Sequence, residues 1–235
     1  MPHLLLVDDA AALTELFADA IRSRLAYDVT VCVALADVED QLATIPDLTL
    51  ALVDLSFPQE QGSGLDALVE IHRDRPDALL ALITQGDEWV ARVLRDAWEL
   101  LPIATVISKS APLQYQLDAI RRTVTSGSAP VDPAIQPLLP ARKSPYRTPA
   151  SFASLVQHAG HAKLWRALIA IDDPTYKELA DESGLKLNTV KNYRAQLVFE
   201  LGTHGLSDPS LKEMGEFARR CRSFLLPYIQ DRTTK

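Results

Sequence analysis

The sequence LALVDLSFP, from Leu50 to Pro58, sets the architecture of the N-terminal half of the chain. It is an apolar run without polar alternation, and it ends in the carboxylate of Asp54 and then in a turn. A continuous apolar run of this length is typical of a parallel strand that is covered on both faces. Because ligands of such sheets bind outside the carboxyl ends of the strands, we expect Asp54 to point into the functional site.

Three further apolar runs end in polar side chains in the same way. They are His3–Val7 before Asp8 and Asp9, Ala78–Ile83 before Thr84, and Ile103–Ser108 before Lys109. Parallel strands would bring three carboxylates, a hydroxyl and an ammonium group together at one edge of the sheet. Crowded carboxylates repel one another unless a cation joins them, and hard oxygen ligands select Mg²⁺ or a related ion. The sequence therefore predicts a metal site at this edge.

Helical patterns connect these runs. Apolar residues recur at helical spacing within residues 13–25, 65–72 and 113–124, a short helix is expected at 36–42, and residues 28–33 form a β-branched strand pattern. The order is that of five βα units, (βα)₅. Since βα crossovers are right-handed, this order predicts a flavodoxin-like, doubly wound α/β sheet.

The polar residues at the strand ends resemble those of the receiver domain of bacterial two-component response regulators, and the resemblance covers residues 1 to about 125. It implies that Asp54 accepts a phosphoryl group from a phosphohistidine on a sensor histidine kinase. It also implies that Mg²⁺ is bound directly by Asp9, Asp54 and the Ser56 backbone carbonyl, and by Asp8 through water. Lys109 would then pair with the phosphoryl oxygens, and Thr84 would sense them.

Elementary chemistry agrees with these roles. Phosphoryl transfer needs positioning and neutralisation of negative charge more than covalent chemistry, so a metal ion and a lysine around a carboxylate suffice. The chain is then no enzyme for a separate substrate, although a receiver can catalyse its own phosphorylation and dephosphorylation. Two positions depart from the family pattern, since Gln85 replaces a small residue and Val106 replaces an aromatic one. Neither change removes a group that the transfer needs.

Charge divides the chain into two unlike halves. Residues 1–125 hold nine Lys or Arg against twenty Asp or Glu, and residues 126–235 hold fifteen against eleven, so net charges are −11 and +4. A basic half is typical of a nucleic-acid-binding module. No apolar run approaches the ~18 residues of a membrane span, and the start is too quickly acidic for a signal peptide. We expect a cytoplasmic protein with no membrane partner.

A proline-rich stretch separates the halves. Prolines stand at positions 130, 133, 137, 140, 145 and 149. Such segments favour extended conformations, so residues 126–150 are predicted to be a semi-rigid linker between a receiver domain at 1–125 and a second domain at 151–235. Arg142, Lys143 and Arg147 are expected to be exposed linker charges. The two cysteines, Cys32 and Cys221, are too few for a disulfide scaffold or a zinc site and are expected to be buried.

The second half has only helical patterns. Apolar residues from 155 to 169 indicate a first helix, and Asp173 is expected to cap the next one with Pro174 at its first position. A short helix around residues 176–183, a turn at Gly184 and a helix opening near Thr189 form a helix-turn-helix. This order predicts a small all-α domain.

This arrangement resembles the DNA-binding domain of NarL/FixJ/LuxR-type regulators, over roughly residues 150 to 225. The match lies in KELA from Lys177, GL at Gly184, NTVKNY from Asn188 and ELG from Glu200. The resemblance implies a recognition helix in the major groove of double-stranded DNA. Base edges would be contacted by Lys191, Asn192 and Ala195, and phosphates by Thr189, Tyr193 and Arg194. Because Lys and Asn offer only two polar base contacts, a homodimer that reads two half-sites is expected in the active state.

A last amphipathic helix is expected from about 210 to 225, ended by Pro227. The histidines of this half, His158, His161 and His204, are expected on helix or loop surfaces.

Together these features predict a DNA-binding transcriptional response regulator controlled by phosphoryl transfer to Asp54. Two alternatives stay open. The helical domain could act by contact with a sigma factor or another regulator, or the protein could bind DNA independently of phosphorylation, as Gln85 and Val106 would allow.

Overall fold

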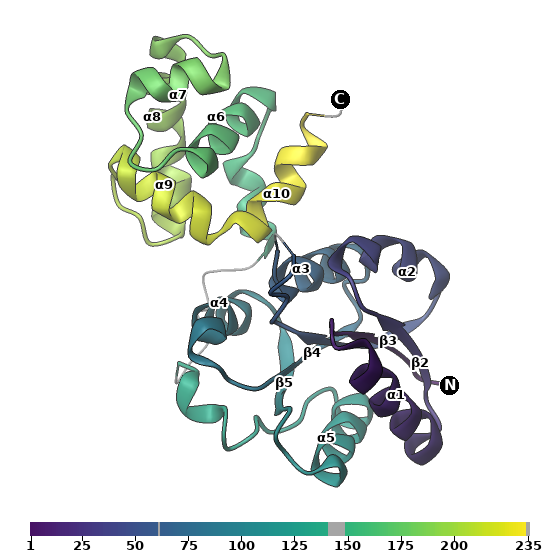
Figure 1. Ribbon diagram of the computed structural model, residues 1–235. Coiled ribbons are helices and arrows are strands. Elements are labelled where there is room, and N and C mark those ends of the chain that lie inside the picture. Colours follow the sequence, from purple (N-terminus) through teal and green to yellow (C-terminus); the bar gives the residue numbers. More distant parts are fainter. Residues whose placement is uncertain (61, 141–148, 234–235) are drawn as a thin grey trace. The chain divides into compact units, whose positions relative to one another are not determined.

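The computed structural model describes residues 1–60, 62–140 and 149–233, and these form two compact units that divide between residues 143 and 144 (Figure 1). Part of the predicted linker, residues 141–148 with Arg142, Lys143 and Arg147, lies outside the described residues. No helix in the described ranges is long and apolar enough to cross a membrane. The predicted domain boundaries at 125 and 150 stay a prediction.

The first unit is a five-stranded, entirely parallel sheet in the order β2-β1-β3-β4-β5. Its strands are β1 (His3–Val7), β2 (Asp28–Cys32), β3 (Leu48–Asp54), β4 (Leu79–Thr84) and β5 (Ile103–Ser108), and its helices are α1 (Ala11–Leu25), α2 (Val38–Thr44), α3 (Gly64–Asp74), α4 (Ala91–Leu100) and α5 (Leu113–Ser126). Short 3₁₀ turns lie at Leu35–Asp37 and Glu88–Val90. This is the flavodoxin-like (βα)₅ fold that the sequence predicts.

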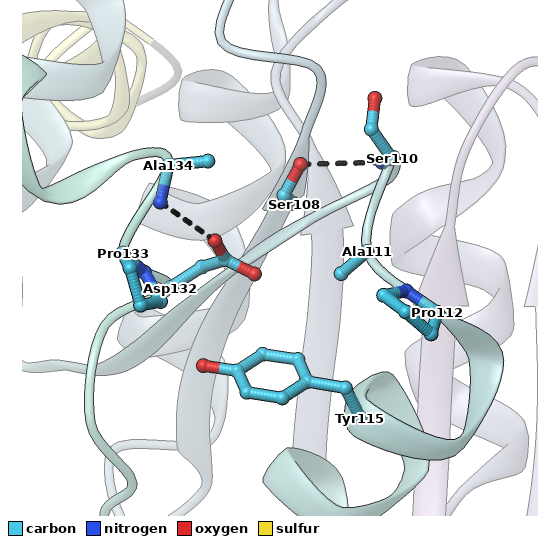
Figure 2. Close-up of a pocket in the computed structure, with 8 residues that line it drawn as sticks. All are labelled: Ser108, Ser110, Ala111, Pro112, Tyr115, Asp132, Pro133 and Ala134. Carbon is cyan, nitrogen blue, oxygen red and sulfur yellow. Dashed lines mark hydrogen bonds between the residues drawn. The ribbon is translucent and has the colours of Figure 1, made fainter.

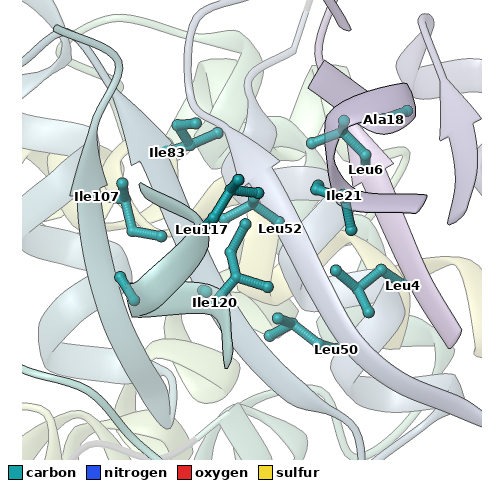
Figure 3. Packing of buried hydrophobic residues seen from close by; sticks show 12 residues of the cluster. Leu4, Leu6, Ala18, Ile21, Leu50, Leu52, Ile83, Ile107, Leu117 and Ile120 are labelled. Atoms are coloured by element: carbon teal, nitrogen blue, oxygen red, sulfur yellow. The ribbon is translucent and has the colours of Figure 1, made fainter. Parts of the chain in front are cut away.

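The central strand β3 is buried because helices cover both faces of the sheet. Residues Leu50 to Val53 have no exposed surface, which explains why the run carries no polar alternation. One face packs against α1 and α5 (Figure 3). The side chains of this layer are Leu4, Leu6, Ala18, Ile21, Leu50, Leu52, Ile83, Ile107, Leu117 and Ile120. This layer fixes the strands whose carboxyl ends carry the polar residues.

The segment after α5 is hydrogen-bonded to strand β5 of the first unit. The backbone N–H of Ala129 donates to the Ala104 carbonyl at 3.2 Å, and that of Asp132 donates to the Val106 carbonyl at 2.9 Å. The Thr105 hydroxyl donates to the Pro130 carbonyl at 3.0 Å. We call Ala129–Leu138, which ends in a 3₁₀ turn at Gln136–Leu138, the strap. It covers the outer edge of β5, although the sequence predicts an extended linker there.

The second unit is all helical, as predicted. It contains a 3₁₀ segment at Pro149–Leu155 and the helices α6 (Ala159–Ala170), α7 (Tyr176–Ser183), α8 (Leu187–Thr203), α9 (Leu211–Arg220) and α10 (Arg222–Asp231). Gly184, at a φ of 66°, turns the chain between α7 and α8 and completes the helix-turn-helix. The core contains the rings of Phe152, Trp165, Phe217 and Phe224.

The predicted cap of α7 is wrong. The N-cap is Thr175 rather than Asp173, because Thr175 and Glu178 form a reciprocal capping box. These hydrogen bonds also hold the pKa of the exposed Glu178 carboxyl below its ordinary value. Asp173 instead has a positive φ of 49°, and Pro174 lies before the helix.

The predicted end of the last helix is also wrong. The chain forms two helices that separate at Cys221, and Pro227 lies inside α10 without ending it. Buried Phe224, Leu225 and Ile229 hold α10 in the core, and this burial outweighs the roughly 3 kcal/mol that an interior proline costs.

Two of the three histidines expected on the surface are buried. His161 lies beside His158 and Tyr193, and His204 packs on Phe152 and Phe217. Burial is possible because a neutral imidazole packs like other aromatic rings. Both cysteines are buried, as predicted.

Candidate functional site

The parallel register brings the predicted acids together. Val7 pairs with Val53 in the sheet, so Asp8, the next residue after β1, lies beside Asp54, the last residue of β3. Carboxylate oxygens of Asp8, Asp9 and Asp54 all lie within 4.8 Å of one another. Asp8 and Asp54 are buried, with 7% and 2% of their surface exposed. A cluster of hard oxygens at this spacing has the donor set of a divalent-cation site.

Lys109 joins the cluster from the end of β5. Its Nζ lies 2.7 Å from Asp8 Oδ2 and 2.9 Å from Asp54 Oδ2, so one ammonium group bridges two buried carboxylates. Burial raises the pKa of Asp54 above its ordinary value, and Lys109 opposes this effect. Burial alone would lower the pKa of Lys109, but its bonds to Asp8 and Asp54 outweigh burial and raise that pKa. The pairing favours the ionised form of both groups.

Gln116, which sequence reasoning missed, holds the turn that carries Lys109. Its side-chain amide donates to the backbone carbonyls of Ser108, Lys109 and Ala111 at 3.2, 3.1 and 2.9 Å. It is a buried amide on the inner face of α5, beside Leu117, Ala119 and Ile120. That polar residue next to Leu117 was the available signal.

Gly64, also missed, allows α3 to begin against the end of β3. Its N–H donates to the Leu55 carbonyl at 3.3 Å, and a Cβ on this residue would overlap the Asp54 carbonyl oxygen. The Leu55 N–H donates in turn to Asp54 Oδ1 at 2.8 Å. The backbone around the Asp54 carboxylate is therefore fixed by a residue without a side chain.

Thr84 ends β4 at the same edge and is buried. Its hydroxyl accepts from the Gly86 N–H at 3.2 Å, and its carbonyl accepts from the Lys109 N–H at 2.8 Å. Ser56 follows β3 by two residues and is half-buried. The side chain of Gln85 is exposed, whereas Val106 is fully buried in β5.

The predicted DNA-contacting residues of α8 fall into two groups. Lys191, Asn192 and Ala195 are exposed, while Val190, Leu197 and Leu201 anchor the opposite side of the helix in the core. Thr189 is half-buried near the start of the helix. The exposed group offers an ammonium, an amide and a methyl group that can contact base edges, and the Lys191 ammonium lies 5.6 Å from the centroid of the Tyr176 ring.

Tyr193 and Arg194 are half-buried and make several contacts within the domain. The Tyr193 ring centroid lies 5.0 Å from those of His158 and His161. The Arg194 guanidinium donates to the Pro209 carbonyl at 2.7 Å and to Asp208 at 2.9 Å. These two residues hold α8 to its neighbours.

The structure adds Phe199 to the exposed side of α8. Its surface is 80% exposed, and at seven and four residues after Asn192 and Ala195 it shares their face. The signal in the sequence was its spacing, because Phe199 is out of phase with the buried Leu197 and Leu201.

A parallel (βα)₅ domain with an acid cluster at its carboxyl edge is thus followed by a helical domain that contains a helix-turn-helix. No protein-family model matches the chain, and no curated protein matches it.

Solved structures of RcsB share the fold over nearly the whole chain. RcsB from Salmonella enterica serovar Typhimurium, bound to the rprA promoter in the presence of phosphomimetic BeF₃⁻, is 14% identical, with 92% of this chain and 98% of that chain covered and a TM-score of 0.50. A structure of two RcsB dimers bound to two parallel DNAs is 15% identical, with 97% and 98% covered and a TM-score of 0.51. The chain therefore has the fold of a full-length response regulator.

Proposed function

We propose that the chain is a DNA-binding transcriptional response regulator, controlled by phosphoryl transfer from a sensor histidine kinase to Asp54. The observation that carries this proposal is the bridge from Lys109 to Asp8 and Asp54 at the carboxyl edge of a receiver fold. Residues 1–125 form the receiver, 126–150 the linker and 151–235 the output domain in this proposal. The protein acts in the cytoplasm, where its kinase and its DNA are accessible.

The transfer uses groups that the fold already holds in place. A carboxylate oxygen of Asp54 attacks the phosphorus of the phosphohistidine, the new P–O bond forms as the P–N bond breaks, and the imidazole nitrogen takes up a proton. Lys109 neutralises the oxygens of the transferred group, and the Thr84 hydroxyl donates to one of them. Mg²⁺, held by Asp9, Asp54 and the Ser56 carbonyl and by Asp8 through water, would supply further charge neutralisation. The same groups allow the receiver to catalyse its own dephosphorylation by water.

The output domain reads double-stranded DNA with α8. Lys191 donates to guanine acceptors, Asn192 pairs with adenine, and Ala195 contacts a thymine methyl group. The exposure of all three residues on one helix supports this role. Because three such contacts give limited specificity, the phosphorylated protein acts as a homodimer on two half-sites.

Intact-mass measurement tests the receiver. We expect wild type to gain one phosphoryl group from acetyl phosphate and Mg²⁺, and Asp54→Asn to gain none. Light scattering on the same samples should show a higher dimer fraction for wild type only. If Asp54 stays unmodified with both acetyl phosphate and a cognate kinase, the phosphorylation-controlled function is wrong.

Duplex DNA binding tests the output domain. Phosphate neutralisation predicts a steep fall of affinity with salt. A domain that works through a sigma factor or another protein would show no such binding at any salt concentration, and this result would favour that alternative.

A further inference from the structure

The strap packs against the loop that follows Thr84. Ile135, which is 1% exposed, and Leu138 lie beside Gly86, and a Cβ on Gly86 would come within 2.8 Å of Ile135 Cδ1 and 3.2 Å of Leu138 Cδ1. Gly86 has a φ of +80°, so its backbone is suited to glycine. The absence of a side chain at Gly86 makes room for these two strap residues.

Gly86 is also bonded to Thr84. Its N–H donates to Thr84 Oγ1 at 3.2 Å. A continuous series of contacts therefore runs from the Thr84 hydroxyl through the Gly86 backbone to Ile135 and Leu138. The opposite side of the strap is bonded to β5 through the Asp132 N–H and the Val106 carbonyl.

We propose that Ile135 and Leu138 are positioning residues that couple Thr84 to the strap, an inference that rests on the proposed phosphorylation of Asp54. On phosphorylation the Thr84 side chain rotates so that its hydroxyl donates to a phosphoryl oxygen on Asp54, and this rotation breaks its hydrogen bond from the Gly86 N–H. The released Gly86 backbone then shifts, and its contacts with Ile135 and Leu138 are lost. The strap loosens from β5, and the signal reaches the segment that leads to the output domain.

A pocket beside the strap leaves part of it room to move. This pocket of about 330 Å³ lies between Asp132, Pro133 and Ala134 of the strap and the segment after β5, with Ser110 in the turn and Tyr115 at the start of α5 (Figure 2). Asp132 is held by hydrogen bonds, since its N–H donates to the Val106 carbonyl on β5 and its carboxylate accepts from the Ala134 N–H at 2.9 Å. Because the pocket is not filled by side chains, these strap residues can shift once the contact with Gly86 is lost.

This coupling accounts for the valine at position 106. Val106 is fully buried and carries no ring that could swing between two positions, so it offers no side-chain switch of its own. Its carbonyl, however, anchors the strap. The element that changes state is then the strap rather than the side chain on β5.

Hydrogen exchange on the full-length protein tests the coupling. With beryllofluoride and Mg²⁺, we expect the amides of Asp132, Ile135 and Leu138 to exchange at least tenfold faster in wild type and to stay unchanged in Asp54→Asn. If β3 and its following loop become protected while the strap is unchanged, the coupling is wrong and the proposed function stands. If neither region responds, the proposed function itself fails.

Reciprocity gives a second test with a matched control. A strap that is released on activation opposes activation, so weakening it must tighten binding of the phosphoryl mimic. We expect Ile135→Ala to bind beryllofluoride several-fold tighter than wild type. Ile45→Ala removes an equally buried side chain at the end of α2, before β3 begins, and should bind like wild type. Equal affinity for all three proteins would overturn the coupling, and Leu138→Ala serves as the strap variant if Ile135→Ala does not fold.

Discussion

The carboxyl edge of the parallel sheet was predicted from strand ends and the contacts on α8 from a resemblance, and the structure fixes the side chains of the two regions to different degrees. At the sheet edge, Lys109 bonds to both Asp8 and Asp54, with Thr84 at the end of the adjacent strand. On α8, two of six predicted contact residues, Tyr193 and Arg194, are half-buried and also contact neighbouring segments of the domain. The difference shows that parallel strand ends fix where a side chain lies, whereas one helix offers several directions.

The largest expected effect tests how rigidly the sheet edge is built. Gly64→Ala should lower the free energy of unfolding by about 3–5 kcal/mol, since the new methyl group must displace the Asp54 carbonyl oxygen. Urea unfolding measures this loss. Gly202→Ala is the matched control, because a Cβ there meets nothing within 4 Å and alanine favours a helix by up to about 1 kcal/mol. A loss below about 1 kcal/mol for Gly64→Ala would show that the backbone at the carboxyl edge of the sheet can shift to accommodate the methyl group.

The next effect tests the division of α8 into two groups. Arg194→Met should cost about 1–2 kcal/mol of unfolding free energy, because it leaves the Pro209 carbonyl and Asp208 without their donor. Lys191→Met should change stability by less than about 0.5 kcal/mol but weaken DNA binding about tenfold. Urea unfolding and a DNA titration at one fixed salt concentration separate the two. If both variants lose DNA affinity equally at unchanged stability, the division is wrong.

The residues in these two predictions show which parts of the fold and of the site could be predicted from the sequence and which could not. The apolar runs and the helical patterns between them predicted the fold, because buried parallel strands such as Leu50 to Asp54 leave a clear apolar signal. The roles of Gly64 and Gln116 could not be predicted, since they depend on backbone atoms that come close only after folding, although the polar Gln116 beside Leu117 is visible in the sequence. The strap was missed for the same reason. Its prolines indicate an extended chain, but not the edge of β5 on which that chain lies.

The N-cap of α7 shows a different limit of prediction from the sequence. Asp173 and Thr175 are both good N-cap residues, and only the Glu178 that follows Thr175 by three positions distinguishes them. The buried histidines illustrate packing that composition cannot reveal, because His161 is held by Tyr193 from a distant part of the sequence.

The folding stability of the helical domain should depend on pH, and this effect should be intermediate in size between the others predicted. Burial, together with the neighbouring His158, lowers the pKa of His161 below its ordinary value. The groups that face it are His158, Tyr193 and Gln196, and none is an acid. As pH falls below the ordinary pKa, the unfolded chain takes up a proton that folded His161 resists, so stability falls by at most about 1.4 kcal/mol per pH unit.

Hydrogen exchange of α6 and α8 at pH 7.5 and 5.5 measures this dependence locally. His161→Gln, which cannot titrate, should reduce the loss of protection on acidification. The same loss in both proteins would assign the pH dependence to other groups.

The smallest effect concerns Phe199, which extends the exposed side of α8 beyond the predicted contacts. Phe199→Ser should change the free energy of unfolding by less than about 0.5 kcal/mol, because the ring is 80% exposed. DNA affinity should fall by no more than about threefold, since residues near the start of a recognition helix contact the bases and Phe199 lies two turns beyond Asn192. The same DNA titration used for Lys191→Met measures it. A loss as large as that of Lys191→Met would mean that α8 lies in the groove along its whole length, and the contact surface of the output domain would then be set by the full exposed face rather than by three residues.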